Sequence, residues 1–278
     1  MPWRLRWRRA RRRTATLSSM PAGPWERRQE PVPVRARPRV TRRHRVESPR
    51  SHRSVGLWFL FVSADVFAQF SGSASVVSDY RFRGISLSHH KPAAQIALAY
   101  DDASGWYGGA FASTVRLGDA TSREVQAVSF VGYAKRDPSG LSWEAGADYS
   151  VVTGDRSYSY AEAYAGVAFE NVSARLYYAP RYFGQDSNAI YGEINASHPL
   201  VDRVRLIAHG GALWNNSEDS YNRRPDHRVF DGSVGVALDL DPFNVQLAWV
   251  GISSHNTLYP VATTGRRNSI VLVLSRSF

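Results

Sequence analysis

Charged side chains recur on one parity of the extended segments between residues 79 and 239, and they are the first candidates for chemistry. Six arginines and eight carboxylates share this parity. They are Asp79, Arg81, Arg83, Arg116, Glu124, Glu144, Asp148, Glu162, Arg175, Arg181, Glu193, Arg205, Asp231 and Asp239. A charge inside a protein costs free energy unless water hydrates it or a partner neutralises it. The pattern predicts either a water-filled pore whose charges set selectivity or a network of ion pairs that braces a closed interior.

Candidate nucleophiles and bases are few. Ser86 and Ser88 precede His89 and His90, and His209 lies on the charged parity of a late segment. A Ser-x-x-His spacing is frequent by chance, and nothing in the sequence supplies the orienting partner or oxyanion hole that nucleophilic catalysis needs. We therefore expect no catalytic residue and no cofactor. Two adjacent loop histidines are usually solvated, so we expect no metal. The absence of cysteine excludes thiolate ligands and disulfides.

The positive charge of the chain is confined to its beginning. Residues 1–53 contain 17 arginines and three glutamates, whereas residues 54–278 contain 18 basic and 21 acidic groups. This distribution argues against a nucleic-acid-binding protein. The head is too poor in apolar residues to form a core, so we expect a disordered extension, 1–53. A basic arm for nucleic acid or anionic lipid is one interpretation. A start codon assigned too far upstream, or an overlong basic region before an export signal, is the favoured one.

An export signal follows the basic head. Residues 55–62 form a short apolar stretch, and the small residues Val66 and Ala68 precede a plausible cleavage point. Eight apolar residues are too few to anchor a chain in a bilayer. We expect residues 54–68 to complete a signal peptide cleaved after Ala68, although a buried strand or short helix is an alternative. The mature protein would begin at Gln69, and residues 69–278 would form one domain.

Alternation of apolar and polar residues dominates residues 69–278 and predicts strands with two different faces. Short turns, such as 101–104 and 137–140, alternate with longer polar connections, such as 85–91 and 215–227. This pattern is typical of an up-and-down antiparallel β-barrel, with ten strands as the alternative if 188–198 and 203–214 are not strands. The twelve predicted strands are 72–84, 92–101, 105–117, 122–135, 140–152, 158–169, 171–183, 188–198, 203–214, 228–240, 243–253 and 266–278.

Three features predict that the apolar face of this all-β barrel points outward to lipid, as in transmembrane barrels. The other face is rich in Gly, Ala, Ser and charged residues, which suit a crowded polar interior. Aromatic residues near the strand ends form two candidate belts at the membrane interfaces. The chain also ends at Phe278 after Ile270, Leu272 and Leu274, the kind of last strand that the outer-membrane barrel-assembly machinery recognises. The belt residues are Tyr100, Tyr107, Tyr133, Trp143, Phe169 and Phe243 at the turn end, and Tyr80, Phe82, Tyr149, Tyr182 and Phe230 at the loop end.

Several segments resemble a known family. Val76–Ser86 reads VVSDYRFRGIS and is followed by KPAAQ at 91–95, while 162–167 and 177–184 read EAYAGV and YYAPRYFG. These segments are similar to the proteobacterial TorF family of porins, formerly the Gcw_chp conserved hypothetical family, and the similarity spans the mature chain. The resemblance implies an outer-membrane barrel with a channel role. The sequence departs from the family pattern at Gln126 and Val128, where acids are common, and at Arg181, where Asp is usual.

The expected function is a channel for passive diffusion of small polar solutes across the outer membrane of a Gram-negative bacterium. A structural or adhesive barrel without an open pore and a lipid-modifying enzyme are the alternatives. Expected partners are outer-membrane lipid, lipopolysaccharide and the barrel-assembly machinery, with no nucleic acid. Both termini would be periplasmic, and 215–227 and 254–265 external. Arg81, Arg83 and Arg181 would face Asp148 and Glu162 across a hydrated constriction near the outer mouth, where the opposed charges create a transverse field.

Overall fold

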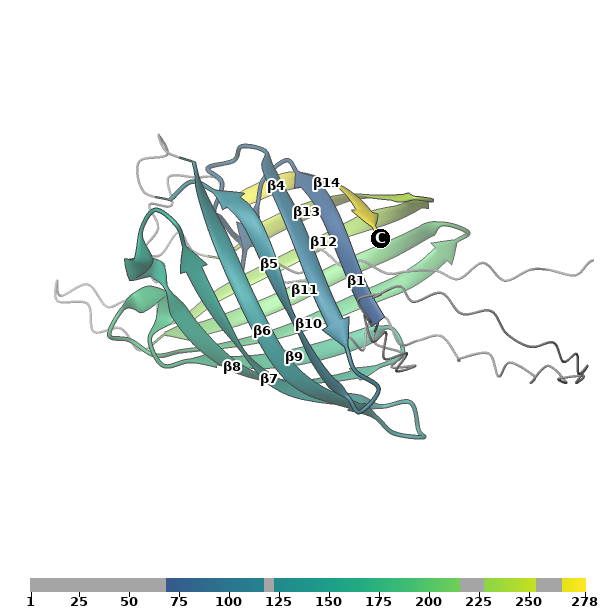
Figure 1. The fold of residues 1–278 in the computed structure, drawn as a ribbon. Helices are drawn as coiled ribbons and strands as arrows, with labels where there is room; N and C mark the ends of the chain where they lie inside the picture. Colours follow the sequence, from purple (N-terminus) through teal and green to yellow (C-terminus); the bar gives the residue numbers. More distant parts are fainter. Residues whose placement is uncertain (1–68, 118–122, 216–227, 254–266) are drawn as a thin grey trace, which may run out of the picture.

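The computed structural model describes residues 69–117, 123–215, 228–253 and 267–278. Twelve strands form a closed barrel in which each strand is antiparallel to both neighbours and strand order follows chain order (Figure 1). The predicted all-β up-and-down barrel of twelve strands is confirmed. The strands are β1 (Gln69–Val77), β4 (Ala93–Asp101), β5 (Trp106–Val115), β6 (Glu124–Arg136), β7 (Ser142–Val152), β8 (Tyr160–Phe169), β9 (Val172–Ala179), β10 (Ala189–Val201), β11 (Val204–Asn215), β12 (Arg228–Leu240), β13 (Phe243–Ile252) and β14 (Asn268–Ser277).

Two predicted strands are shorter than expected, whereas the ends of the others lie within three residues of the prediction. The first strand stops at Val77 because the chain then folds back as a small hairpin, β2 (Arg81–Phe82) and β3 (Ile85–Ser86). Arg83 and Gly84 both have positive φ, 49° and 81°, which is the backbone of a two-residue type I′ turn.

The seventh predicted strand ends early as well. Strand β9 stops at Ala179, directly before Pro180, which has no N–H to donate to a ladder. The chain continues into a 3₁₀ turn, η2 (Tyr182–Gly184), and a second such turn, η1 (Arg156–Tyr158), connects β7 with β8. Among the described residues, no helix has the length and apolar character needed to span a membrane.

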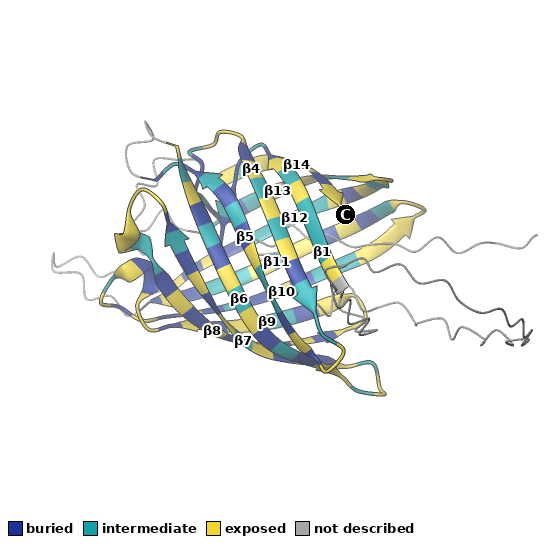
Figure 2. Cartoon of the chain, viewed as in Figure 1, coloured by how far each residue is buried: buried dark blue, intermediate teal, exposed yellow. Residues whose placement is uncertain are grey.

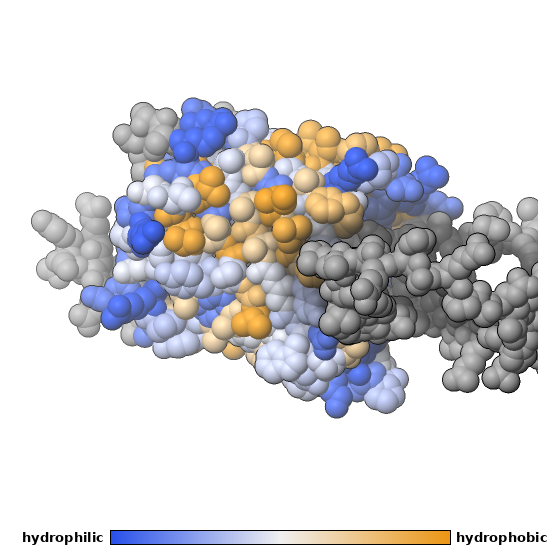
Figure 3. Space-filling view, in the orientation of Figure 1, coloured by the Kyte–Doolittle hydropathy of each residue, from blue (hydrophilic) through white to orange (hydrophobic). Residues whose placement is uncertain are grey.

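The outer surface of the barrel is apolar, whereas the interior contains the buried charged side chains together with a cluster of aromatic and aliphatic residues. Figure 2 shows exposed and buried positions alternating along the strands, and Figure 3 shows apolar residues over the middle of the visible face, with hydrophilic ones towards the ends. On β7, for example, Trp143 and Tyr149 are exposed, whereas Glu144, Asp148 and Ser150 are buried inside. The predicted orientation of the two faces is therefore correct for this strand, and β4, β12 and β14 follow the same rule.

The prediction was wrong for β5, whose two faces are reversed. Tyr107, Phe111 and Val115 are buried in the interior, whereas Trp106 is exposed. Both faces of this strand lack charges, so alternation alone does not orient it. The strand is oriented by its register with β6. Tyr107 pairs with Gly132, and that glycine leaves room inside the barrel for the phenol ring. Arg116 consequently follows the strand on the parity opposite to buried Val115 and is half-buried.

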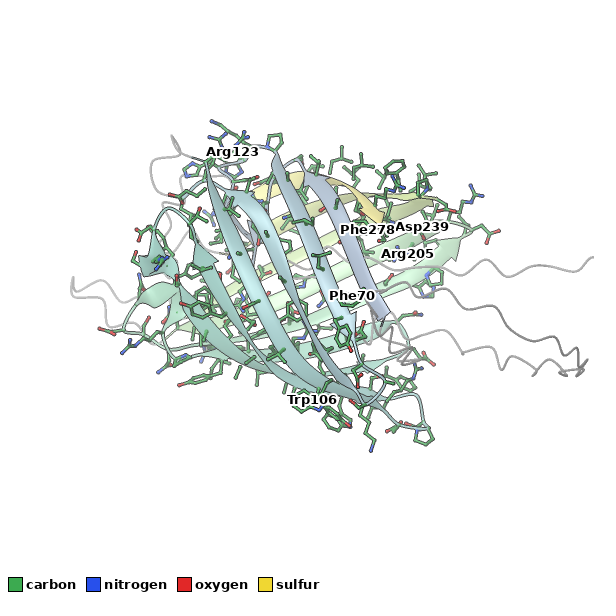
Figure 4. All side chains as sticks on the ribbon, in the orientation of Figure 1. Phe70, Trp106, Arg123, Arg205, Asp239 and Phe278 are labelled. Carbon is green, nitrogen blue, oxygen red and sulfur yellow. The ribbon has the colours of Figure 1, made fainter. Side chains whose placement is uncertain are left out.

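Aromatic side chains lie on the outside of the barrel at the turn end, the end with the short connections. The rings of Phe70 and Tyr100 pack against each other at a tilt, and Tyr133 lies between Trp106 and Trp143. Figure 4 shows Phe70 and Trp106 towards the end of the barrel that also carries Phe278, with Arg123 at the opposite end. Exposed aromatic residues near the loop end are Tyr149, Tyr178, Trp214, Phe230 and Trp249. Four residues predicted for the belts are instead buried in the interior: Tyr80, Phe82, Tyr107 and Tyr182.

The barrel closes between its first and last strands through a short seam. The β1–β14 ladder has five residue pairs, fewer than any other pair of neighbouring barrel strands. Phe278 extends the seam because it exchanges two backbone hydrogen bonds of 3.0 Å with Gly72. A Cβ atom at position 72 would collide with the Phe278 ring, so glycine allows the terminal aromatic residue to lie over β1.

Candidate functional site

The hairpin Arg81–Ser86, here called the inserted hairpin, extends into the loop-end mouth of the barrel. It and its flanking residues touch the wall on several sides. The Tyr80 hydroxyl donates to Gln126 of β6 at 3.0 Å, and the backbone N–H of Arg116 donates to the Leu87 carbonyl at 2.7 Å. Across the lumen, a Cβ atom on Gly84 would come within 2.7 Å of Asp231 on β12. The first connection therefore narrows the mouth instead of extending outward.

Arg83 at the tip of the inserted hairpin contacts both a carboxylate and several aromatic rings of the interior. Its guanidinium donates two hydrogen bonds to Glu162 of β8, at 3.0 and 2.7 Å. Four aromatic rings lie within 4.2–5.4 Å of its central carbon, those of Phe82, Tyr177, Tyr182 and Tyr191. Both partners of the ion pair are almost completely buried, with side chains 2% and 1% exposed. The expected hydrated gap between Arg83 and Glu162 is thus replaced by a direct ion pair.

A second guanidinium continues this arrangement towards the turn end. Arg175 of β9 lies over Tyr164 and Tyr177, at 5.3 and 5.7 Å, and forms an ion pair with Glu144 of β7. Tyrosine rings and guanidinium groups therefore alternate in the order Tyr164, Arg175, Tyr177, Arg83, Tyr191, and we call this series the tyrosine–arginine ladder. At the Arg175 end of the ladder, the Tyr107 hydroxyl donates a hydrogen bond to Glu144 at 2.7 Å.

Asp148 differs from the other buried carboxylates beside the ladder. It pairs in register with Glu162, so two acids lie side by side on β7 and β8. The residue is 96% buried, and neither carboxylate oxygen has a hydrogen-bond partner. It interacts electrostatically with Glu162, Arg83 and Arg175. The wall therefore places a second acidic side chain, without a hydrogen-bond partner, next to the ion pair of Arg83 and Glu162.

Asp79 organises the base of the inserted hairpin. Its carboxylate accepts from Arg81 at 2.8 Å and from the hydroxyl of Ser86, and it contacts Nδ1 of His90 at 3.0 Å. Ser88 also donates to it, at 3.3 Å. The serine hydroxyls that were weighed as nucleophiles thus bond to a carboxylate, and in this geometry they brace the hairpin. In the described part of the chain, no cluster of three or more His, Cys, Asp or Glu residues is arranged to hold a metal ion.

His209 belongs to a separate polar cluster on β10–β12. Its Nδ1 lies 2.7 Å from the Asn195 side-chain oxygen and its Nε2 lies 2.9 Å from Asp231. The Tyr191 hydroxyl joins both His209 and Asp231, at 3.2 and 3.1 Å. Tyr191 thereby connects this cluster with the ladder. Nearer the turn end, Arg205 pairs with Asp239 at 3.2 Å and also donates to Ser197, and Figure 4 shows Arg205 and Asp239 at that end.

Most of the predicted interior charges lie inside the barrel, but two do not. Arg181 follows β9 on the outside of the mouth, with a side chain that is 77% exposed and a 4.0 Å contact to Asp186. Arg116 is the other exception, for the reason given for β5. Glu124 is half-buried at the start of β6 on the inward parity. The residues that the structure places in the interior are Asp79, Arg81, Arg83, Glu124, Glu144, Asp148, Glu162, Arg175, Glu193, Arg205, Asp231 and Asp239.

The interior tyrosines were missed by sequence reasoning. Tyr160 and Tyr164 flank Glu162 at a spacing of two, Tyr177 follows Arg175, and Tyr191 precedes Glu193. A strand places residues two apart on the same face, so each tyrosine shares the parity of a predicted interior charge. That spacing was the available signal.

Among the described residues, the exposure of inward side chains differs between the two sides of the barrel. The inward residues of β7 and β8 are mostly buried and include the large side chains of Glu144, Glu162 and Tyr164, whereas several inward residues of β1, β4 and β12 are small and half-exposed. Ser73 and Ala97 represent the first two strands of the open side, and Ser233 and Gly235 represent β12. The lumen therefore has one densely packed side, which carries the tyrosine–arginine ladder, and another side on which several small residues are half-exposed.

Comparison with known sequences places the chain in a family. The sequence profile of Gcw_chp, described as a bacterial protein of unknown function, matches residues 63–278. The chain belongs to this family. The match confirms the Gcw_chp part of the resemblance, whereas the TorF name and a channel role form no part of the family's description. No curated protein is significantly similar to the chain in sequence.

Solved structures resemble the chain at low identity. The KdgM porin is 10% identical, covers 75% of this chain and 99% of its own, and has a TM-score of 0.48. The NanC porin is 11% identical, with coverage of 76% and 99% and the same TM-score. LpxR from Salmonella typhimurium is 8% identical, with coverage of 75% and 99% and a TM-score of 0.39. Similarities of this size say nothing about substrate or activity.

Proposed function

We propose that this protein is an outer-membrane channel for passive diffusion of small polar solutes, with the inserted hairpin forming its constriction. The observation that carries the proposal is the inverted barrel. Leu98, Val131 and Leu272 face outward and are exposed, whereas Glu144 and Arg205 are buried inside. A soluble barrel would put its apolar face inside, whereas lipid favours an apolar outer band between two aromatic belts.

The two walls of the lumen support a narrow passage. Twelve strands make a wider barrel than the eight at which side chains fill the interior. The ladder and the inserted hairpin occupy part of that width, and the small residues of β1, β4 and β12 border the rest. A solute would pass along Ser73, Ala97 and Ser233 and would meet the hairpin at the mouth.

Single-channel recording tests this function. The full chain would be expressed in a Gram-negative host, purified from its outer membrane and inserted into planar bilayers. We expect small, defined conductance steps. A variant with Asp79–Ser88 replaced by a short Gly-Ser linker should give larger steps, because it lacks the constriction. The control replaces exposed residues 154–156 in the same way and should conduct like the wild type.

A structural barrel without an open pore is the second candidate. The buried ion pair of Arg83 and the contacts of Gly84 across the lumen favour it, since they seal part of the mouth. The hairpin-less variant decides between the two candidates. If it stays silent at high protein load while remaining folded, the protein is not a channel.

The place of the protein in the cell follows from its proposed export. We infer that residues 1–68 include a signal peptide, that the barrel inserts among outer-membrane lipid and lipopolysaccharide, and that the assembly machinery recognises the last strand through Phe278. Residues 1–68 and the connections 216–227 and 254–266 lie outside the described residues. Deletion of Phe278 should lower the amount of folded barrel in outer-membrane fractions, whereas a Ser277→Ala control should not.

A further inference from the structure

The cage around Arg83 belongs mostly to the barrel wall. Glu162 lies on β8, Tyr177 on β9 and Tyr191 on β10, and Asp148 lies beside Glu162 on β7. Tyr182 follows β9 in η2. The inserted hairpin contributes only Arg83 itself and the ring of Phe82. The anionic and aromatic groups would therefore keep their positions if the hairpin moved out of the mouth.

The chemistry of this cage selects flat, delocalised cations. A carboxylate that accepts two parallel N–H bonds matches the fork of a guanidinium, and tyrosine faces attract its charge and its plane. An ammonium makes the charge interaction but not the paired bonds. Asp148, 96% buried next to Glu162, adds a second acidic side chain whose oxygens have no hydrogen-bond partner and can accept N–H bonds from a cation.

The backbone conformation of Arg83 is unfavourable for an arginine, which indicates that contacts of its side chain with the cage stabilise it at this position. Its φ of 49° is left-handed, a conformation in which type I′ turns prefer Asn, Asp or Gly. An arginine at this place is disfavoured by the turn and favoured by its contacts with Glu162 and the rings. The Arg83 side chain occupies the cage as a free guanidinium would, but it is covalently attached to the inserted hairpin.

We propose that Glu162, Asp148 and the rings of Tyr177, Tyr182 and Tyr191 form a binding site for guanidinium-bearing solutes, and that such a solute displaces Arg83 and releases the inserted hairpin. The displacement rests on the proposed channel function, whereas the binding site does not. Solutes of this class would then open their own path, because occupation of the cage by the solute removes the contact that holds the hairpin in the mouth.

Binding is tested without conduction, on the protein purified in detergent. The Arg83→Ala variant exposes the cage, and isothermal titration with methylguanidinium should show saturable binding. N-methylurea, its neutral isostere, should not bind. Adding Glu162→Gln should weaken binding by about tenfold or more, because a charge-assisted hydrogen-bonded pair is lost. Folding of each variant is checked by heat-modifiable migration in gels.

A matched control separates the cage from simple pairing with a carboxylate. Arg205→Ala also removes a buried guanidinium from an acid, Asp239, but that pair has no ring stacked on it among the described contacts. It should bind methylguanidinium about tenfold more weakly than Arg83→Ala. Equal binding by both variants, or none by folded Arg83→Ala, would overturn the site. If Arg83→Ala does not fold, Arg83→Lys is used, which keeps the charge without the paired bonds.

Release of the hairpin is measured on the wild-type protein in bilayers. Conductance should rise and saturate with methylguanidinium and stay constant with N-methylurea. Binding to Arg83→Ala together with a fall in wild-type conductance would mean that the solute blocks the path, and it would overturn the displacement. Binding without any conductance in the wild type or the hairpin-less variant would overturn the channel function and leave the site standing.

Discussion

Arg83 and Glu162 are 79 residues apart in the chain, and their ion pair joins the inserted hairpin to the opposite wall. Removal of one partner of a buried ion pair leaves the other charge without compensation, which costs about 3–5 kcal/mol. The hairpin can avoid this cost by leaving the mouth, since its arginine is then hydrated. The ion pair therefore holds the hairpin in the mouth, and its strength depends on the carboxylate of Glu162.

Glu162→Gln should release the hairpin. Arg81 and Arg83 are buried in the wild type, so trypsin added outside intact cells should leave them uncut. In the variant, we expect cleavage after these arginines, detected by mass spectrometry of the fragments. Glu124→Gln is the matched control, because among the described residues that carboxylate makes no hydrogen bond or ion pair with the hairpin. Equal protection in both variants would show that the remaining contacts suffice to hold the hairpin.

The charged interior could be predicted from parity, but the pairing could not. Alternation placed Glu144, Asp148 and Glu162 on one face, since that face is opposite Trp143 and Tyr149. Which cation meets which acid depends on how the barrel closes, because the contacts join strands distant in sequence. Arg181 was predicted to lie inside but lies outside for a local reason, because Pro180 ends the backbone pairing of β9 one residue before it.

At the scale of the strands, glycines opposite aromatic residues shape the packed wall. Gly146 of β7 pairs directly with Tyr164 of β8, and a Cβ atom on it would lie 2.5 Å from the phenol oxygen and the Val131 carbonyl. Gly132 and Gly109 face Tyr107 and Phe130 in the same way. Each glycine therefore leaves room for the neighbouring ring to lie along the wall.

Gly146→Val should destabilise the barrel by about 1–3 kcal/mol, the usual cost of forcing extra volume into a packed interior. Thermal unfolding of the purified protein measures the change. Gly210→Val on β11 is the control, because no atom lies within 4 Å of a Cβ at that outward position, and it should be neutral. The double variant with Tyr164→Ala should recover part of the loss. If Gly210→Val is equally harmful, glycine matters for the strand backbone itself.

The strands themselves were largely predictable, because a period of two continues through each of them and turn residues separate them. The inserted hairpin was not predictable. Apolar and polar residues also alternate over Tyr80–Arg83, and this alternation continues the pattern of β1 without a break. Alternation records which residues share a face, but it does not distinguish a strand in the wall from a strand folded inside it. Strand β5 failed for the related reason that neither of its faces carries a charge.

Orientation of the whole barrel can be tested by labelling, because the chain has no cysteine. Asp155→Cys places a thiol in the exposed loop-end connection between β7 and β8, and Ser139→Cys places one in the exposed turn between β6 and β7. If the loop end is external, a membrane-impermeant maleimide should label the first variant on intact cells and the second only after lysis. The opposite pattern would reverse the proposed topology.

The mature length of the molecule is also open to test. A signal peptide cleaved after Ala68 predicts that protein from the outer-membrane fraction begins at Gln69, where β1 begins. N-terminal sequencing of that material decides it. A start near Met1 or Met20 would contradict the proposed cleavage.

The location of the inserted hairpin in the first connection has a consequence for the order of events in biogenesis. Its tip is synthesised before every residue that it contacts in the wall, since Glu162, Tyr177 and Tyr191 are added much later. Arg83 must therefore wait, hydrated, until β8–β10 have joined the sheet. Docking of the hairpin would therefore follow the assembly of β8–β10 and belong to the later steps of maturation.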